Sequence, residues 1–334
     1  MKLIIDAYGG DNAPGEIVKG TVDSLNSSDG FSVIFTGKKD GIQAELDKYE
    51  YPKDRVEIAD APDVILMEDH PVEAVRKKKE SSMVVGLNLL KEKKGDAFIS
   101  CGSTGACLAG ATFIVGRIKG VLRPALAPVL PNKNNGVLLI DCGANMDCKP
   151  AALAQFAVMG SAYMEKVMGV ENPRVGLANV GTEDTKGNEV TKETFALIRG
   201  QNAVNFTGNA EGRDLIDRVD VMVADGFTGN LMLKSMEGFG SYVMEIMKSS
   251  FTETLRCKIG AALLMPALKK LKKSLDYNAY GGAPFLGVEG IVIKGHGSNK
   301  AKGVSATISQ AVKMVQADIV SVIKENIAEK SVNE

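Results

Sequence analysis

The chain has 334 residues, 45% of them hydrophobic, and its 40 Lys and Arg nearly balance its 41 Asp and Glu. It can therefore bury a large core, as one large domain or as two lobes. Balanced charge, no Trp and few aromatic residues argue against a nucleic acid partner. The five cysteines are odd in number and form no pair of Cys-x-x-Cys motifs, so we expect reduced thiols and no metal site.

Short apolar runs recur along the chain, and seven end in a turn that combines glycine with Asn, Asp, Ser or Thr. Helical patterns fill the intervals between them, which predicts an α/β fold with a mainly parallel sheet. No low-complexity linker divides the chain, so we expect a single domain over residues 1–334, or two lobes that share the sheet. The seven runs cover residues 3–6, 97–100, 137–141, 175–180, 204–207, 221–224 and 291–294.

Asp6 interrupts the first apolar run after four residues, and no apolar stretch approaches about 18 residues. We therefore expect a cytoplasmic protein that meets a membrane at most peripherally. At the other end of the chain, apolar residues recur at helical spacing over 304–327 and predict a helix that docks on the core.

The glycine turns are the candidate binding sites, because ligands of parallel α/β sheets sit outside the carboxyl ends of the strands. The first candidate, Gly102-Ser103-Thr104-Gly105, resembles a phosphate-cradling turn but lacks the Gly-Lys-Ser/Thr ending of a Walker A loop. By itself it is a weak signal. The second candidate is the turn from Gly143 to Asn145.

Residues 179–189 form the densest polar run. Gly181 and Thr182 suit an anion site at a strand end, and Lys186 is close enough in sequence to place its ammonium on the same anion. A solvated surface loop is the alternative. Residues 225–230 follow the same logic, with Gly229 and Asn230 at the start of a helix, and there the alternative is an ordinary helix cap.

Two histidines could act as general bases near neutral pH. His70 precedes a proline in an expected exposed loop, whereas His296 follows a strand and suits either a site or a structural turn. No Gly-x-Ser-x-Gly nucleophile elbow occurs in the chain. If the protein is an enzyme, the attacking group therefore comes from the substrate.

Residues 251–275 break the pattern of strand and helix. Apolar residues recur there among lysines, and Gly260 and Pro266 suggest two helices that meet at an apolar tip, with Leu263, Leu264 and Met265. An apolar tip ringed by lysines suits an anionic membrane surface. The alternative is an amphipathic hairpin that packs against a second subunit.

Long motifs over nearly the whole chain resemble those of bacterial phosphate acyltransferases. They are residues 6–14 (DAYGGDNAP), 71–83 (PVEAVRKKKESSM), 102–110 (GSTGACLAG), 115–125 (VGRIKGVLRPA), 141–145 (DCGAN), 182–189 (TEDTKGNE), 208–212 (GNAEG), 225–230 (DGFTGN), 280–284 (YGGAP) and 296–299 (HGSN).

The resemblance implies transfer of a long-chain acyl group from an acyl carrier protein thioester to inorganic phosphate, without a cofactor, in phospholipid synthesis. It also implies a three-layer α/β/α fold like that of isopropylmalate dehydrogenase, with a protruding hairpin near 251–275, and a homodimer. The acyl phosphate would pass to a membrane glycerol-3-phosphate acyltransferase.

This chemistry needs little acid or base help, because a thiolate leaves readily and hydrogenphosphate is already anionic. The site must supply position and charge stabilisation. We expect Lys186, Asn230 and Asp225 to be the catalytic residues, with Lys186 orienting phosphate and Asn230 supporting the oxyanion, and with the turn at 143–145 as the alternative support. The expected substrate-binding residues are Gly102, Ser103, Thr104, Gly143, Asn145, Gly181, Thr182, Glu183, Asn209, Gly229 and His296.

Acyl carrier proteins are acidic, so basic residues near the site loops are candidate docking points. We expect Arg117, Lys119 and Arg123 to serve, whereas the basic run 76–79 suits either docking or a solvated helix face. The need to deliver a long-chain product to a membrane enzyme favours membrane contact at Leu263, Leu264 and Met265, which can coexist with dimer packing.

Three other functions compete. A short-chain enzyme that uses coenzyme A thioesters would share the fold and the chemistry. A nicotinamide-linked dehydrogenase is disfavoured, since the first strand turn lacks Gly-x-Gly-x-x-Gly and no aspartate cluster is apparent. A non-catalytic, membrane-recruited scaffold for phosphorylated ligands is the third.

Overall fold

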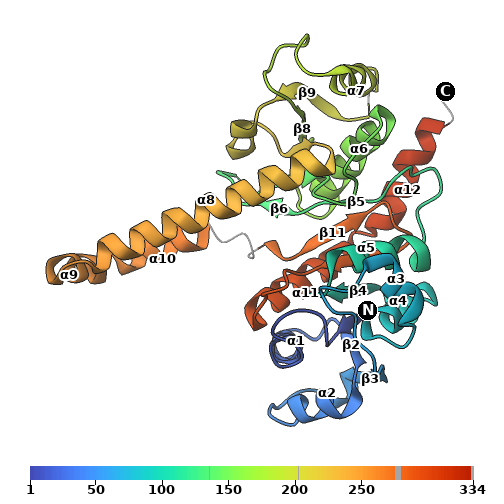
Figure 1. The fold of residues 1–334 in the computed structure, drawn as a ribbon, viewed down its shortest axis with the longest axis vertical. Coiled ribbons are helices and arrows are strands. Elements are labelled where there is room, and N and C mark those ends of the chain that lie inside the picture. The colour runs from blue at the N-terminus through green and yellow to red at the C-terminus, as the bar shows by residue number, and fades with distance from the viewer. Residues whose placement is uncertain (135, 202, 275–279, 332–334) are drawn as a thin grey trace.

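The computed structural model describes residues 1–134, 136–201, 203–274 and 280–331. Within these residues the strands form two sheets, one in each lobe (Figure 1). The strands of the first sheet are β1 (Lys2–Asp6), β2 (Ser32–Gly37), β3 (Val56–Asp60), β4 (Ala97–Ser100), β5 (Ala125–Leu126), β11 (Ala283–Leu286) and β12 (Ile291–Lys294). Those of the second are β6 (Val129–Leu130), β7 (Val137–Ile140), β8 (Arg174–Ala178), β9 (Asn205–Ala210) and β10 (Val221–Val223).

Helices alternate with the strands as the sequence predicts. They are α1 (Gly15–Ser27), α2 (Lys39–Leu46), α3 (Pro71–Lys77), α4 (Ser82–Lys91), α5 (Thr104–Gly110), α6 (Pro150–Lys166), α7 (Glu189–Arg199), α8 (Gly226–Thr252), α9 (Leu255–Leu263), α10 (Met265–Ser274), α11 (Ala301–Gln316) and α12 (Ile319–Ser331).

Both sheets are mainly parallel. Their strand orders are β3-β2-β1-β4-β12-β11-β5 and β6-β7-β10-β8-β9, and only the pairs that involve β11, β5 and β6 are antiparallel among the described strands. Each lobe therefore has its own sheet, whereas the sequence suggested two lobes that share one sheet. They are joined through residues 125–130, where β5 pairs with β11 and β6 with β7, on either side of Pro128, which has no N–H to donate to a ladder.

In the first lobe, alternate residues of each strand pack on opposite faces of the sheet. Leu3 and Ile5 of β1 belong to the core that α1 and α11 cover, whereas Ile4 belongs to the core under α4 and α5. The sheet is thus sandwiched between two helical layers, which confirms the α/β/α expectation for this lobe.

In the second lobe, α6 covers one face of the sheet and the first turns of α8 cover the other (Figure 1). The core beneath α6 is continuous with that of the first lobe. A buried hydrogen bond also crosses between the lobes, from Nε2 of Gln310 on α11 to the Tyr163 hydroxyl on α6, at 2.9 Å. The shared core and this hydrogen bond fix the position of one sheet, and of the ends of its strands, relative to the other sheet.

The hairpin protrudes as expected but is longer than residues 251–275. Its outgoing limb is the 27-residue helix α8, while α9 lies at the far end and α10 returns along α8 (Figure 1). The break falls between Leu263 and Met265, because Pro266 occupies the first turn of α10. Residue 275, the end of the predicted hairpin, lies outside the described residues.

The C-terminal segment docks on the core as predicted, with Ile308, Ile319 and Ile323 buried. It is two helices rather than one, because Asp318 adopts a left-handed backbone conformation (φ 43°) between α11 and α12. In the part of the chain that the structure describes, no helix has the length and apolar character needed to span a bilayer.

Candidate active site

A cavity of about 330 Å³ lies between the strand ends of the two lobes and is here called the polar pocket after Lys294, His296 and Asn230, although most of its other lining residues are apolar. From the first lobe it is lined by Thr104 after β4 and by Lys294 and His296 at the end of β12. From the second lobe Gly143 after β7 and Asn230 on α8 face it. Carboxyl ends of strands from both sheets therefore meet at one cavity, where a parallel α/β protein binds its ligand.

Glycines seat the start of α8 against the turn after β7. The Gly226 N–H donates to the Asn145 carbonyl at 2.8 Å. A Cβ on Gly229 would lie 1.9 Å from the Asp141 carbonyl oxygen, and one on Gly143, whose φ is +106°, would lie 3.6 Å from Cγ of Asn230. Close packing thus explains Gly229 and the positive φ explains Gly143, whose contact places the Asn230 side chain beside it.

The two asparagines of this region differ in what their side chains are free to do. Asn145 donates from Nδ2 to the carbonyl of Pro124 at 2.8 Å and to the carboxylate of Asp141 at 3.0 Å, which uses both its N–H groups. Asn230 is half-buried in the pocket, and its side chain makes no hydrogen bond to a described residue. Of the two predicted oxyanion donors, Asn230 is therefore the available one.

Asp225 has the alternative role considered from the sequence, that of a helix cap. Its carboxylate accepts from the backbone N–H of Thr228 at 2.8 Å and from the hydroxyl of the same residue at 2.9 Å. It thus fixes the first turn of α8, and the position of Asn230 with it.

The predicted anion loop after β8 stands at the same edge of the second sheet, because β8 is the parallel neighbour of β10. The Lys186 side chain folds over Gly181, with its Cγ 3.2 Å from the place a Cβ would take on that glycine. Thr182, Glu183 and Lys186 are exposed and line neither interlobe pocket. Asn209 holds the loop, since its Nδ2 donates to the Glu183 carbonyl at 2.8 Å.

In the turn after β4, only Thr104 reaches the polar pocket. Ser103 caps α5 by accepting from the N–H of Ala106 at 3.4 Å, and the Gly102 N–H donates to the hydroxyl of Ser100 at 3.0 Å. That hydroxyl donates in turn to Asp6 at 2.6 Å. Gly102 and Ser103 are both buried, so their hydrogen bonds shape the turn.

Lys294 is the residue that the sequence analysis missed. Its side chain is buried, with 7% of the residue exposed, and it lines the polar pocket. Burial lowers the pKa of the Lys294 ammonium below its usual range. The sequence feature that could have identified Lys294 is its position at the end of an apolar strand, immediately before a glycine turn. Beside it, Nδ1 of His296 lies 2.8 Å from the Ser298 hydroxyl, and burial lowers the pKa of the imidazole.

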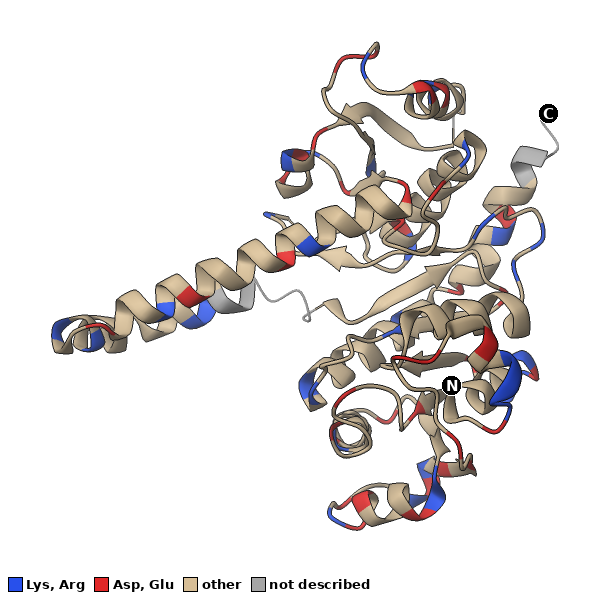
Figure 2. Ribbon diagram, in the orientation of Figure 1, with Lys and Arg blue, Asp and Glu red and all other residues tan. Residues whose placement is uncertain are grey.

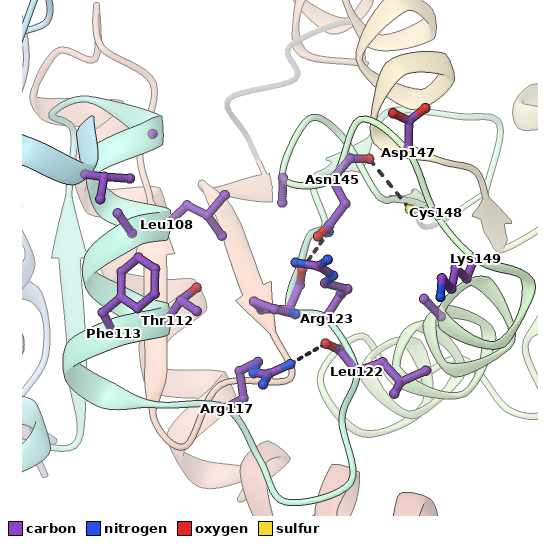
Figure 3. Close-up of a pocket in the computed structure, with 16 residues that line it drawn as sticks. Leu108, Thr112, Phe113, Arg117, Leu122, Arg123, Asn145, Asp147, Cys148 and Lys149 are labelled. Carbon is purple, nitrogen blue, oxygen red and sulfur yellow. Dashed lines mark hydrogen bonds between the residues drawn. The ribbon is translucent and has the colours of Figure 1, made fainter. Parts of the chain in front are cut away.

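A second and larger cavity of about 910 Å³, here called the apolar pocket, adjoins the polar one. Leu108 and Phe113 line it from the first lobe, and Arg123 and Lys149 face them (Figure 3). Arg117 also lines it and donates to the carbonyl of Leu122. Lys119, the third predicted docking residue, is exposed but does not line this pocket.

The two pockets are separated by two pairs of consecutive residues. Thr104 and Gly143 line the polar pocket, whereas the residues that follow them, Gly105 and Ala144, line the apolar one. Two ligands, one in each pocket, would therefore meet at this junction, near the Asn230 amide. Such an arrangement can bring an apolar donor and a small polar acceptor together.

Comparison with known proteins identifies relatives over nearly the whole chain. A model of the family described as "Fatty acid synthesis protein" matches residues 1–322. The chain is 48% identical over 333 residues to the phosphate acyltransferase of Clostridium novyi (strain NT), which covers 99% of this chain and 100% of that protein.

Solved structures share the fold at low sequence identity. The EutD phosphotransacetylase from Staphylococcus aureus superposes with a TM-score of 0.62 at 16% identity, over 95% of this chain and 94% of that one. A structure described as a 4-hydroxythreonine-4-phosphate dehydrogenase from Salmonella typhimurium gives 0.52 at 12% identity, over 94% and 99%. These likenesses confirm the predicted α/β fold, which phosphotransacetylases and dehydrogenases share.

Proposed function

The chain belongs to the family of bacterial phosphate acyltransferases and is an acyltransferase, and we propose that it moves a long-chain fatty acyl group from an acyl carrier protein thioester to inorganic phosphate. A phosphate oxygen attacks the thioester carbonyl carbon, and the bond from that carbon to sulfur breaks. The products are the acyl phosphate and the carrier thiolate, which takes up a proton. The reaction consumes no cofactor.

The apolar pocket is the observation that carries this proposal. Its volume of about 910 Å³ far exceeds the need of a two-carbon acyl group, and Leu108, Phe113 and Leu122 give it an apolar wall. Arg117, Arg123 and Lys149 add three cations to the lining of this pocket, and Asp147 adds one anion (Figure 3). An apolar cavity with a cationic border suits a long acyl chain on an acidic carrier protein.

The reacting atoms meet at the junction of the two pockets in this proposal. Lys186 and the N–H groups near Gly181 and Thr182 line neither pocket, so in this proposal they attract phosphate at the exposed edge of the second sheet rather than at the junction itself. The Asn230 amide donates to the oxyanion of the tetrahedral intermediate, and Asp225 holds that amide in place by capping α8. Because the thiolate is a good leaving group, position and charge stabilisation suffice.

The acyl donor is tested by offering both thioesters to the purified protein. We expect phosphate-dependent release of free thiol from a long-chain acyl carrier protein at a much higher kcat/KM than from an acyl-coenzyme A. Preference for a short-chain acyl-coenzyme A would instead favour the short-chain enzyme. Binding of carrier and vesicles without thioester consumption would favour the non-catalytic scaffold.

Charge reversal tests carrier docking. Arg123→Glu is expected to weaken carrier binding more at low salt than at high salt, because exposed charges are screened. Lys19→Glu is the matched control, since Lys19 is exposed on α1, across the first sheet from α5. An equal loss at all salt concentrations would indicate a folding defect and reject the docking role of Arg123.

The hairpin carries two apolar surfaces that suit two partners. Phe239, Tyr242 and Ile246 recur at helical spacing on α8 and are 69%, 59% and 45% exposed, which suits a second subunit in a homodimer. At the tip Leu263, Leu264 and Met265 are 79%, 52% and 44% exposed. Lys and Arg residues of α9 and α10 lie near the tip (Figure 2), which suits an anionic membrane surface.

A peripheral membrane position would serve the next reaction. A long-chain acyl phosphate is poorly suited to diffusion through water, so release at the cytoplasmic membrane face would deliver it to a membrane glycerol-3-phosphate acyltransferase. In this proposal the interlobe pockets handle the chemistry, and the hairpin decides where the product leaves.

A further inference from the structure

We infer that the polar pocket is an anion site built around the buried ammonium of Lys294 and that orthophosphate occupies it. The inference rests on the proposed function and deepens it, because it names the group that balances the charge of the nucleophile inside the molecule. Lys186 acts on phosphate from the exposed edge of the second sheet, whereas Lys294 acts from within the cavity.

The first argument is that Lys294 lacks a counterion. The residue is 7% exposed, and its Nζ donates to two backbone carbonyls, those of Cys101 at 3.4 Å and of Gly295. No carboxylate in the described ranges lies within salt-bridge distance of it. A buried charge without a partner is costly, so proteins keep one where a ligand supplies the opposite charge.

The second argument is the charge of the rest of the pocket. The other charged residues in its lining are Lys234 and Glu237, which pair with each other at 2.7 Å and cancel. The uncompensated charge of the pocket is therefore that of Lys294. The His296 ring faces the same space and can donate to an oxyanion, and the Asn230 amide has a second N–H besides the one assigned to the tetrahedral intermediate. An anion with several acceptor oxygens matches this set of donors.

The third argument is size and position. A volume of about 330 Å³ exceeds the need of one phosphate ion and leaves room beside it for the thioester group. The larger apolar pocket begins on the other side of Thr104 and Gly143. Phosphate on Lys294 would reach the thioester carbonyl carbon from the polar pocket, while the acyl chain attached to that carbon extends into the apolar pocket. This placement leaves the carbonyl carbon open to attack by the phosphate oxygen.

Phosphate binding to the full-length protein is the direct test, measured by calorimetry with inorganic phosphate and by the KM for phosphate in acyl transfer. Lys294→Met is expected to weaken phosphate binding about 10 to 100-fold, the loss that follows from removing a charged hydrogen-bond donor. The KM for the acyl donor should stay unchanged, and Lys294→Arg should retain most of the affinity. Lys300→Met is the matched control, because Lys300 is exposed a few residues farther along.

The melting temperature separates this role from a structural one. Lys294→Met replaces a buried ammonium by an apolar chain of similar length, so Tm should stay the same or rise. Weak phosphate binding at an undiminished Tm therefore reports a lost ligand contact. If the Met variant fails to fold, acetylation of the wild-type amine by acetic anhydride gives the answer, since bound phosphate should protect Lys294 and leave Lys300 reactive.

A pH series adds an independent readout. Burial lowers the pKa of Lys294, so its ammonium loses the proton earlier than an exposed lysine as pH rises. Phosphate affinity of the wild type should fall through that range, whereas the Arg variant should keep its charge and its affinity. The titratable groups around Lys294 are Asp11, Cys101, Cys107, Lys234 and His296, and the Arg variant leaves them all in place.

Two results would overturn the inference. One is a phosphate affinity of Lys294→Met within twofold of the Lys300→Met value. The other is equal acetylation of Lys294 with and without phosphate. If the wild-type protein consumes no acyl thioester but Lys294→Met still loses phosphate binding, the anion site is supported and the proposed function is rejected.

Discussion

Asp141 and Asn145 are joined by two hydrogen bonds, in which the Asp141 carboxylate accepts from the backbone nitrogen of Asn145 at 2.6 Å and from its side-chain nitrogen at 3.0 Å. The same buried carboxylate accepts from the N–H of Leu126 at 2.9 Å and of Ala144 at 3.2 Å. One side chain thereby ties the segment that connects the lobes to the turn that faces α8. This fixes Gly143 against Asn230 at the junction of the two pockets.

Asp141→Ala should destabilise the protein by about 3 kcal/mol, because it leaves several buried N–H groups without acceptors. Urea denaturation gives the change as a lower midpoint. Asp147→Ala is the control, since Asp147 is exposed nearby and should shift stability by no more than about 0.5 kcal/mol. Equal midpoints for the two variants would contradict a structural role of Asp141.

Asn230→Ala and Asp225→Ala should separate the oxyanion donor from the cap. Removal of one preorganised oxyanion donor lowers kcat by about 100 to 1000-fold, so Asn230→Ala should show that loss with little change in Tm. Asp225→Ala should cost about 1 kcal/mol of stability, because α8 loses its N-cap. Steady-state kinetics beside thermal melts provide the measurement, and normal turnover in Asn230→Ala would reject the oxyanion role.

Lys186→Ala should reduce acyl phosphate formation about 10-fold, because its exposed ammonium attracts phosphate to this edge of the second sheet. Lys192→Ala is the matched control, since Lys192 is exposed on the neighbouring helix α7. Both variants should fold normally, because neither lysine is buried. Near-normal product formation by Lys186→Ala would remove this residue from the mechanism.

Asp220 should contribute a pH-dependent part of the stability. Burial opposes its ionisation, but the hydrogen bonds and charge of Arg174, with Nε and Nη2 each 2.9 Å from the carboxylate, lower the pKa of Asp220 below its ordinary 3.8. Between the two pKa values the unfolded chain binds more protons than the folded one, so this stability is present above pH 3.8 and is lost as pH falls through the folded pKa.

Asp220→Asn should therefore cost on the order of 2 kcal/mol at pH 6 and progressively less as the solution is acidified below the ordinary pKa of Asp. Denaturant midpoints at pH 6 and pH 3 measure the difference. Asp184→Asn is the control, because its ion pair with Arg199 is exposed and should contribute less than about 1 kcal/mol at either pH. A constant cost of Asp220→Asn across the range would contradict the lowered pKa.

The hairpin tip should bind anionic vesicles. Leu263→Asp combined with Leu264→Asp should abolish flotation with such vesicles, because two charges replace exposed apolar side chains at the tip. A double variant outside the hairpin, Leu66→Asp with Leu197→Asp, should float like the wild type, although both leucines are exposed. Equal flotation of the tip variant and the wild type would reject the tip as an anchor.

Local chemistry made much of the fold and part of the site readable from the sequence. Apolar runs that stop at glycine turns placed β4, β7, β8, β10 and β12 closely, because strand and turn preferences act over a few neighbouring residues. The Asp225 cap was likewise among the readings that the sequence offered, since capping joins residues three apart. Pro266 predicted the break in the hairpin for the same local reason.

Long-range packing decided the remainder. The division into two sheets depends on which strands pair through residues 125–130, a choice between partners far apart in the chain. The sequence offered Asn230 as the oxyanion donor and the turn ending at Asn145 as the alternative, and only the neighbours of each amide show that the Asn145 side chain is fully engaged.

The sequence by itself determined that glycine turns follow parallel strands, and its motifs pointed to the acyltransferase family. The tertiary structure alone decided which turns meet and which charge is buried among them. Lys294 illustrates the reason: the carbonyl of Cys101 after β4 accepts from its buried ammonium, and Gly143 after β7 and Asn230 of α8 line the same pocket, a set of residues that the chain brings together only when both lobes have folded.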